Sequence, residues 1–548
     1  MQYDTIVVGA GSAGATLAAR LATDAGRQVL LLEAGADWRS ADADAALRAP
    51  NPSTIITDAA YARFRYDDLT AARTAAQAPR TYWRGRGLGG SSTVNGQIAI
   101  RATREDFDRW VAMGCAGWGF DDVLPYFCRL ETDLAYGDRP YHGDDGPIPI
   151  HRATLSTFGP VDRLLAESAL DDGMPWAADH NAPDAYGVSP YAINSRNGER
   201  VTTNDAYLEP LRGANNLTVR CAVQVDQVLF EGTRAVGVSF LSTGAGSGSG
   251  NGAANRVANG KRDVAYARRV VLAAGAVHSP AILIRSGIGP APVLQSLARS
   301  VLADLPVGAS LQDHALFALA LRLRPEQVPP PGFRHTNCCA RVAAEDASSG
   351  PGDLMFVAMN RLGDSLGRRA LDDHAPAIGM LGVWLNRCLS RGRLEFRSLD
   401  PFAHPAVHLD MLQEPLDRAR LRSGVRRLVR LARHRAVAEV AEHVFVSATG
   451  WGGGRANALG LDQIADLDDA TLDRLMLETV GDTQHATATC RMGDPNHPDT
   501  VVDPACRVLG VTGLWVIDAS VMPEVPTANT HLTTVMIAER MAEQLAAD

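Results

Sequence analysis

Two short apolar runs near the N-terminus flank a helical pattern. Residues 4–9 and 28–33 are almost continuously apolar, which is typical of buried parallel strands. Between them, apolar residues recur at helical spacing over residues 12–23. The pattern therefore predicts a β-α-β unit of about thirty residues.

Strand patterns return in the middle of the chain. Residues 213–242 and 264–274 predict strands, and the Gly/Ser/Asn-rich residues 243–261 predict a hairpin insertion between them. Several segments of residues 352–411 alternate between apolar and polar positions, which favours an antiparallel sheet. Residues 414–447 predict a pair of Arg-rich amphipathic helices.

Composition excludes several classes of partner and chemistry. The 548-residue chain has a net charge of −9, which argues against nucleic acid, a partner that requires a basic face. We expect no membrane span and no export signal, and hence a cytoplasmic protein. Without a C-x-x-C pair we expect no metal site, and the adjacent Cys338 and Cys339 are expected to stay reduced. The single lysine, Lys261, argues against Schiff-base or P-loop chemistry.

A glycine motif lies at the first predicted turn. Gly9, Gly11 and Gly14 follow the first strand and open the helix, and Glu33 ends the second strand. In this arrangement Gly9 permits the tight turn, Gly11 admits a pyrophosphate, and Gly14 lets helix and strand pack closely. A carboxylate at Glu33 suits ribose hydroxyls and disfavours a 2′-phosphate. The motif predicts dinucleotide binding, and by itself leaves FAD and NAD open.

Further segments carry a resemblance to a known family. They are residues 85–96, 275–290, 307–314 and 485–540. Together they resemble the glucose–methanol–choline (GMC) family of FAD oxidoreductases. Residues 136–150 are most similar to its 5-hydroxymethylfurfural oxidase and aryl-alcohol oxidase members. The resemblance covers essentially the whole chain.

The resemblance implies an α/β fold with two domains. A discontinuous Rossmann-like FAD-binding domain is expected over residues 1–155, 195–312 and 470–548. A substrate-binding domain, built on an antiparallel sheet flanked by helices, is expected over residues 156–194 and 313–469. No oligomeric state is predicted.

The resemblance also implies the residues that hold FAD. Asn95 is expected to bond the flavin or its ribityl chain, with a turn cap as the alternative role. Some family members attach FAD through a His just before this Asn, but this chain has Val94 there, so we expect non-covalent FAD. The expected cofactor contacts are Gly9, Gly11, Ser12, Ala13, Gly14, Glu33, Ala34, Gly90, Ser91, Asn95, Val225, Asp518, Ala519, Asn529 and Thr530.

Alcohol oxidation needs a group that removes the hydroxyl proton, and histidine suits this at neutral pH. His485 and His531 are the candidates, since each lies in a segment that carries the resemblance. His485 is expected to be the general base and His531 a hydrogen-bond donor to the substrate oxygen, although the two roles are interchangeable on the sequence. His278 and His314 are expected to be structural.

Three residues are candidates for the substrate pocket. Val383 and Trp384 lie on a predicted strand that could face the flavin, with core packing as the alternative for both, and Gln484 precedes the candidate base. Furfural-oxidase-like sequences usually carry Trp in place of Gln484 and Asn in place of His531, so the pocket here is expected to be wider.

The expected reaction is oxidation of a primary, aromatic or furanic alcohol by hydride transfer to flavin N5, with O₂ as acceptor and H₂O₂ as product. Three alternatives stay open: a dehydrogenase of an aliphatic or choline-like alcohol with a quinone or other acceptor, a hydroxynitrile lyase, and a non-enzymatic flavin-binding protein. The absence of a G-x-S-x-G elbow argues against an α/β-hydrolase.

Overall fold

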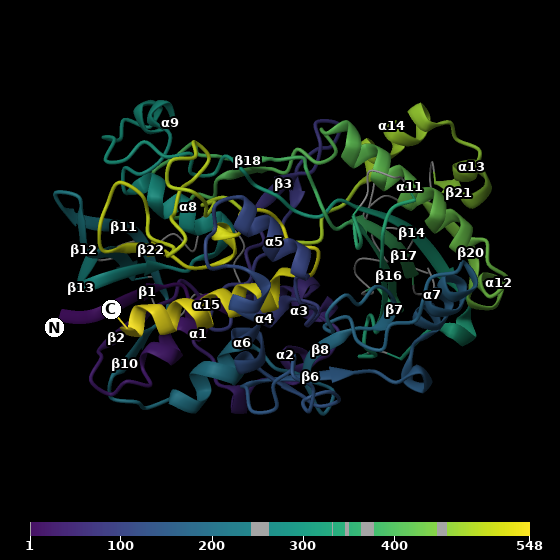
Figure 1. Cartoon of the computed structure of the whole chain (residues 1–548), viewed down its shortest axis with the longest axis horizontal. Helices are drawn as coiled ribbons and strands as arrows, with labels where there is room; N and C mark the ends of the chain where they lie inside the picture. Colours follow the sequence, from purple (N-terminus) through teal and green to yellow (C-terminus); the bar gives the residue numbers. More distant parts are fainter. Residues whose placement is uncertain are drawn as a thin grey trace.

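Two large sheets lie at opposite ends of the molecule, with helices and small sheets between and around them (Figure 1). The computed structural model describes residues 2–242, 262–330, 332–345, 350–362, 378–446 and 458–547. The predicted hairpin insertion at 243–261 lies outside these residues. Within them, no helix combines the length and apolarity needed to span a membrane.

The first sheet has seven strands and contains the predicted β-α-β unit. Its order is β10-β2-β1-β13-β12-β11, and β22 also pairs with β13. Helix α1 (Ser12–Leu21) connects β1 to β2, which run parallel because the crossover helix returns the chain to the same edge. The strands are β1 (Gln2–Val8), β2 (Val29–Leu32), β10 (Leu217–Arg220), β11 (Val223–Glu231), β12 (Arg234–Ser242), β13 (Arg262–Leu272) and β22 (Leu514–Val516).

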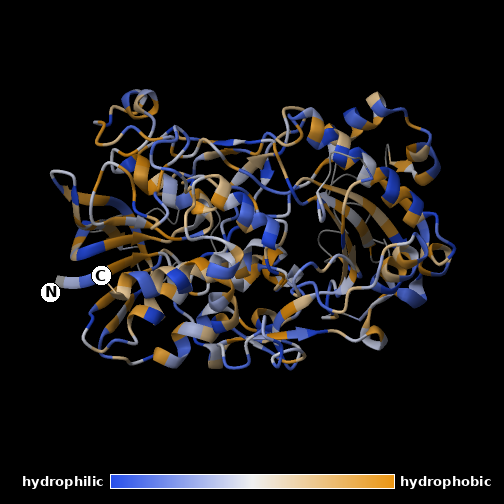
Figure 2. Ribbon diagram, viewed as in Figure 1, coloured by the Kyte–Doolittle hydropathy of each residue, from blue (hydrophilic) through white to orange (hydrophobic). Residues whose placement is uncertain are grey.

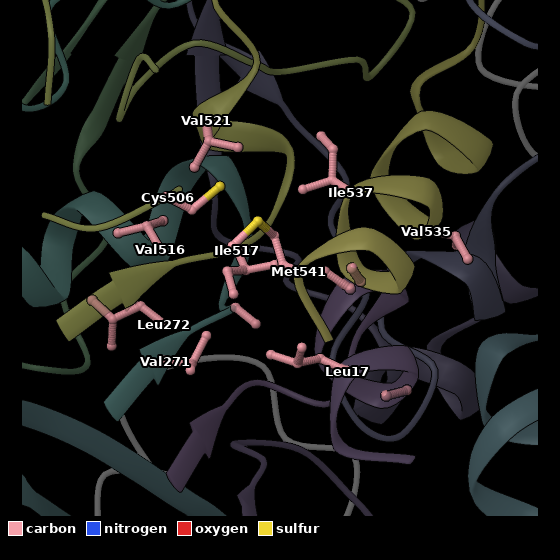
Figure 3. Packing of buried hydrophobic residues seen from close by; sticks show 14 of the residues in the cluster. Leu17, Val271, Leu272, Cys506, Val516, Ile517, Val521, Val535, Ile537 and Met541 are labelled. Carbon is pink, nitrogen blue, oxygen red and sulfur yellow. The ribbon is translucent and has the colours of Figure 1, made fainter. Parts of the chain in front are cut away.

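Helix α15 (Thr530–Ala547) packs beside α1 over this sheet. Figure 3 shows Leu17 of α1, Val271 of β13, Val516 of β22 and Met541 of α15 meeting in one cluster. All four side chains are buried, and burying each stabilises the fold by about 1.5–3 kcal/mol. The C-terminal helix is therefore a core element of the first sheet, and its N-terminus is fixed relative to α1.

The second sheet is antiparallel throughout. Its order is β21-β20-β14-β17-β16-β15-β7, and helices α7 (Pro160–Asp171) and α11 (Pro415–Ala432) pack against it. Apolar residues run along its strands, whereas polar residues gather on the outer helices (Figure 2). Its strands are β7 (Gly187–Pro190), β14 (Leu316–Leu323), β15 (Cys338–Val342), β16 (Leu354–Met359), β17 (Ile378–Leu385), β20 (Ala441–Val446) and β21 (Leu459–Gly460).

Two details of the predicted elements are wrong. The last alternating segment, β18 (Arg393–Glu395), belongs to a separate four-stranded sheet, with order β18-β19-β3-β4. The other strands of that sheet are β19 (Ala406–His408), β3 (Thr70–Ala72) and β4 (Arg80–Thr81). Within residues 414–446, only one long helix forms, α11 (Pro415–Ala432), after which α12 (Val437–Val440) is a single turn. The chain then pairs with the edge of β14 as β20, so tertiary pairing overrides the local helical pattern.

All eight cysteines are free in the structure, including Cys338 and Cys339. Both are buried in β15, where strand pairing with β16 and β7 fixes their backbone. Burial raises the pKa of each thiol well above its ordinary range, so both are inert neutral side chains.

Candidate active site

A cavity of about 650 Å³ is lined by residues of both large sheets. All but two of the residues expected at the site lie on its wall. These two are Gly14 and Val383. Those on the wall are Gly9, Gly11, Ser12, Ala13, Glu33, Ala34, Gly90, Ser91, Asn95, Val225, Trp384, Gln484, His485, Asp518, Ala519, Asn529, Thr530 and His531.

Two glycine loops meet at one end of the cavity. Gly9 has φ +99°, and a Cβ there would lie 2.5 Å from the carbonyl oxygen of Ala273. A Cβ on Gly14 would lie 1.8 Å from the Gly9 oxygen, so Gly14 serves helix–strand packing rather than the cavity wall. Gly11 and Gly90 approach so closely that a Cβ on Gly90 would lie 2.6 Å from the Cα of Gly11. The backbone at the start of α1 is thereby left open to an anion.

Glu33 is buried and links the two glycine loops by hydrogen bonds. Its carboxylate accepts hydrogen bonds from the backbone N–H groups of Ala10, Gly35 and Gly87, each at 2.8 Å. A carboxylate has about four lone-pair sites, so acceptor capacity remains for a ribose hydroxyl. Glu33 thus both shapes the loops and offers the expected ribose contact.

Asn95 and Asp518 are also bonded within the protein. Asn95 Oδ1 accepts from the Gln97 N–H at 2.9 Å, which is the turn cap considered as the alternative for this residue. Asp518 accepts from the Gly275 N–H at 2.8 Å and from the Ser279 hydroxyl at 2.6 Å. It therefore anchors the start of α8 (Gly275–Arg285) beside the end of β22.

His485 lies among polar side chains from three segments. Its Nδ1 lies 2.7 Å from the Thr483 hydroxyl and 2.9 Å from Nδ1 of His314. Its Nε2 lies 3.1 Å from Nδ2 of Asn529, in the loop before α15. His531 also lines the cavity, and its Nδ1 lies 3.1 Å from the Ser12 hydroxyl at the start of α1.

Both candidate catalytic histidines are neutral at physiological pH. Burial, followed by His314 and Arg84, holds the pKa of His485 well below its ordinary value. Burial, followed by the charge of Arg200, lowers the pKa of His531 to about 4. A neutral imidazole has one nitrogen without a proton, which is what a general base requires.

Strand β17 presents Trp384 to the cavity and Val383 to the opposite side. Trp384 lies edge-on to His485, with ring centroids 6.2 Å apart, and parallel to His314 at 6.1 Å. Val383 is fully buried in the core under α11, close to Gly424. The pocket prediction for Val383 was therefore wrong, because successive strand residues point to opposite faces.

The wall near His485 carries charged groups that the sequence did not indicate. Arg84 Nη1 donates to the Gln484 carbonyl at 2.9 Å, and its guanidinium lies 4.0 Å from the Tyr82 ring. Arg73 pairs with Asp482 at 2.6 Å. Arg80 and Arg361 also line the cavity.

Three residues around His485 escaped the sequence reasoning: Thr483, His314 and Arg84. Arg84 and Thr483 lie one and two residues outside the segments 85–96 and 485–540, and their polar side chains next to these segments were the available signal. His314 was expected to be structural, and its contact with His485 spans 171 residues. No local pattern reports a contact of that range.

A group of possible metal ligands lies beside the base. Donor atoms of Asp313, His314 and His485 lie within 4.8 Å of one another. Each of them has a hydrogen-bond partner, including the Tyr82 hydroxyl, which donates to Asp313 at 2.6 Å. These bonds account for the cluster, and we assign no metal to it.

The cavity fits a flavin dinucleotide. Its glycine cradle and Glu33 suit the pyrophosphate and ribose. Farther along the wall, Asn529 Oδ1 and Arg84 Nη2 are buried polar atoms with no partner among the described residues. Polar atoms left in this way are what a bound polar ring system would satisfy.

Solved structures share this architecture over the whole chain. Pyridoxine 4-oxidase from Mesorbium loti superimposes with a TM-score of 0.85 and 29% identity, covering 100% of both chains. A fungal aryl-alcohol oxidase superimposes with a TM-score of 0.78 at 21% identity, covering 100% of this chain and 99% of that one, which shows the fold alone.

Sequence relatives span the same length. The chain is 33% identical to 5-(hydroxymethyl)furfural oxidase from Methylovorus sp. (strain MP688), over 99% of this chain and 98% of the relative. It is also 33% identical to oxygen-dependent choline dehydrogenase from Yersinia pestis, over 100% and 94%. Models of the GMC oxidoreductase N- and C-terminal regions match residues 3–316 and 389–538. The chain therefore belongs to the GMC oxidoreductase family, and it is an FAD-dependent oxidoreductase that acts on CH–OH groups.

Proposed function

We propose that this enzyme oxidises a primary aromatic or furanic alcohol to the aldehyde, with His485 as the general base. The observation that carries the proposal is a neutral His485 on the same cavity wall as the glycine cradle. His485 takes the hydroxyl proton at Nε2, and His531 hydrogen-bonds the substrate oxygen. When bound, FAD supplies the acceptor for the carbinol hydride, with O₂ as the final oxidant and H₂O₂ as the product.

The cavity wall supports a flat apolar substrate. Ile98, Leu316, Val357, Met359 and Trp384 line it. An aromatic or furan ring gains from burial against such side chains and from the edge or face of an indole. The relatives named furfural oxidase and pyridoxine oxidase act on ring alcohols according to their names, which agrees with this choice.

Electrostatics disfavour the second candidate, a choline-like substrate. The positive charge of Arg84 contributes to lowering the pKa of His485, so its field reaches the reacting position. The carboxylates on the described cavity wall are Glu33, Asp482 and Asp518, and each already accepts hydrogen bonds from the protein. A quaternary ammonium would meet repulsion from Arg84, and Asp482, three residues before His485, is already paired with Arg73.

A matched pair of alcohols tests the substrate class. Choline and 3,3-dimethylbutan-1-ol have the same shape and differ in charge. In anaerobic stopped-flow mixing, we expect benzyl alcohol and 5-hydroxymethylfurfural to bleach the flavin fastest, and the neutral alcohol to bleach it faster than choline. Faster reduction by choline would instead favour the choline-like alternative.

The acceptor and the product need separate measurements. Under air, we expect one H₂O₂ per aldehyde formed. A turnover that needs an added quinone would favour a dehydrogenase, and aldehyde release without flavin bleaching would favour a lyase. A cytoplasmic location and non-covalent attachment of FAD remain proposals made from the sequence.

Replacing the base tests its role directly. His485→Ala is expected to keep the flavin spectrum and to slow flavin reduction by at least about 100-fold, the usual contribution of acid–base catalysis. His531→Ala is expected to slow it less, because it removes a hydrogen bond rather than the base. If His531→Ala were the more damaging variant, the two roles would have to be exchanged.

A further inference from the structure

A short backbone ladder holds His314 opposite His485. Leu316 and Gly481 exchange two backbone hydrogen bonds, at 2.8 and 2.9 Å, and Gln312 and Thr487 exchange two more, at 3.0 and 3.3 Å. The His314 ring lies within this frame, 2.9 Å from His485 between the two Nδ1 atoms. The contact between the imidazoles is thus built into paired backbone rather than made by two mobile side chains.

The tautomer of His314 follows from its other nitrogen. Nε2 of His314 lies 2.9 Å from the carbonyl oxygen of Pro526, and a carbonyl can only accept. Nε2 therefore carries the proton. Burial lowers the pKa of His314 to about 4, so the ring is neutral and its Nδ1 is a bare acceptor. The proton between the two Nδ1 atoms consequently belongs to His485.

A second acceptor faces the same proton. The Thr483 hydroxyl lies 3.0 Å from the Asp313 carboxylate and 2.7 Å from Nδ1 of His485. The Asp313 carboxylate also accepts from the Tyr82 hydroxyl and from the backbone N–H of His314. These bonds favour its ionised form, although burial and the charge of Asp482 raise its pKa. Thr483 therefore donates to Asp313 and accepts from His485.

We propose that His314 and the Thr483–Asp313 pair act together as an acceptor clamp on Nδ1 of His485. They hold the proton on Nδ1 and leave Nε2 bare to take the substrate proton. Asn529 Nδ2 lies 3.1 Å from Nε2 of His485. An amide NH₂ group can only donate, so this contact requires an Nε2 without a proton. His314 and Thr483 are positioning residues, since they act through His485 and not on the substrate.

The inference rests on the proposed function, and the experiment separates the two. His314→Leu removes one acceptor, whereas His314→Gln can still donate to Pro526 and accept from His485. Thr483→Val and Thr483→Ser form a second such pair, with a smaller change in volume. The measurements are the limiting rate of anaerobic flavin reduction and the apparent Kd of the alcohol, on the FAD-loaded enzyme.

We expect His314→Leu and Thr483→Val each to lower the limiting rate about 10–100-fold with an unchanged Kd, the range known for partners of an oriented histidine. The Gln and Ser variants should recover most of the rate. The double variant should be slower than either single one, because no acceptor remains. Selective ¹⁵N-histidine NMR should show His485 as the Nδ1-protonated neutral tautomer in the parent and as a mixture of the two neutral tautomers in the double variant.

His180→Leu is the matched control. His180 is a buried histidine that also contacts a backbone carbonyl, that of Gly187, through Nε2 at 2.8 Å, and its Nδ1 faces Cys339 instead of His485. The clamp is wrong if the control slows reduction as much as His314→Leu does. It is equally wrong if Gln and Ser fail to restore the rate, or if the loss lies in Kd alone. If no alcohol reduces the parent enzyme, the proposed function fails instead.

Discussion

Val94 decides how the cofactor is held. Its branched aliphatic side chain lines the cavity next to Asn95. By the family resemblance, Val94 occupies the position where some members carry a histidine linked to FAD. A valine has no nucleophilic atom and cannot bond to the flavin ring. We therefore expect the glycine cradle, Glu33 and side-chain contacts to retain FAD without a covalent link.

This makes a direct prediction for purified enzyme. Acid or heat precipitation should release all of the yellow colour into the supernatant, with the spectrum of free FAD. A coloured pellet would show a covalent link and would require a different attachment residue. The parent enzyme is its own control when the same sample is first passed through a desalting column at neutral pH.

A single glycine tests the cradle. Gly90 has φ +50° and lies so close to Gly11 that a Cβ would have to displace backbone. We expect Gly90→Ala to lose FAD on dilution, with a Kd raised at least about tenfold, since a 1.4 kcal/mol change is enough for that factor. Titration of apoenzyme with FAD, followed by fluorescence quenching, measures it.

Gly173→Ala is the control for strain. Gly173 also has positive φ, at +85°, but a Cβ there would meet nothing within 4 Å. It should cost about 1 kcal/mol of stability, the price of a left-handed alanine, and leave FAD binding unchanged. Equal loss of FAD in both variants would mean that strain, not crowding, is responsible.

At the scale of elements, strand β17 has two faces with different tasks. Trp384 is cavity wall, and Val383 is core beneath α11. Trp384→Ala should therefore change the Kd and preference for ring alcohols, with an added loss of stability because the indole is also buried. Val383→Ala should lower the free energy of unfolding by about 1–2 kcal/mol through the lost methyl groups, and leave the Kd unchanged. A reversed pattern would mean that the strand is out of register.

Local elements were predictable where local chemistry decides them. The β1–α1–β2 unit was predictable from its two apolar runs and from glycines at positions where the turn between β1 and α1 requires them. The side of β17 that faces the cavity was not predictable, because alternation gives two opposite faces without saying which is which. The local pattern likewise predicted a helix where β20 forms, because its pairing partner β14 lies more than a hundred residues earlier in the chain.

The same division holds for the site. His485 and His531 could be chosen because each lies in a segment with recognisable family motifs. His314 also lies in such a segment, but its role beside His485 could not be chosen, nor could that of Arg84, because these roles arise from contacts 171 and 400 residues away in sequence. Side-chain assembly across separate sheets is a property of the folded chain, and no spacing in the sequence encodes it directly.

At the scale of the whole molecule, buried neutral histidines set the response to acid. Burial lowers the pKa of His314 and His531 to about 4, and that of His180 and His335 to about 3. Their unfolded value is about 6.5. Below that pH the unfolded chain binds protons that the folded chain refuses, so stability falls as the pH drops from about 6.5 towards the folded values.

The holoenzyme should consequently melt at a lower temperature at pH 5 than at pH 7.5. A group lowered to about 4 contributes about 2 kcal/mol to this loss at pH 5. His180→Gln, which removes one titrating ring remote from His485, should make the decline shallower. A melting temperature that is flat between pH 7.5 and 5, at fixed FAD concentration, would contradict the assignment.

The four backbone hydrogen bonds between residues 312–316 and 481–487 have one more consequence. They join the start of β14, in the second sheet, to the segment that carries the base. If β14 shifted its register against residues 481–487, His485 would lose its acceptors. The glycine cradle, which is formed by other segments, would stay intact. Such an enzyme would remain yellow and inert, so colour alone is a poor measure of whether a preparation or a redesigned variant is competent.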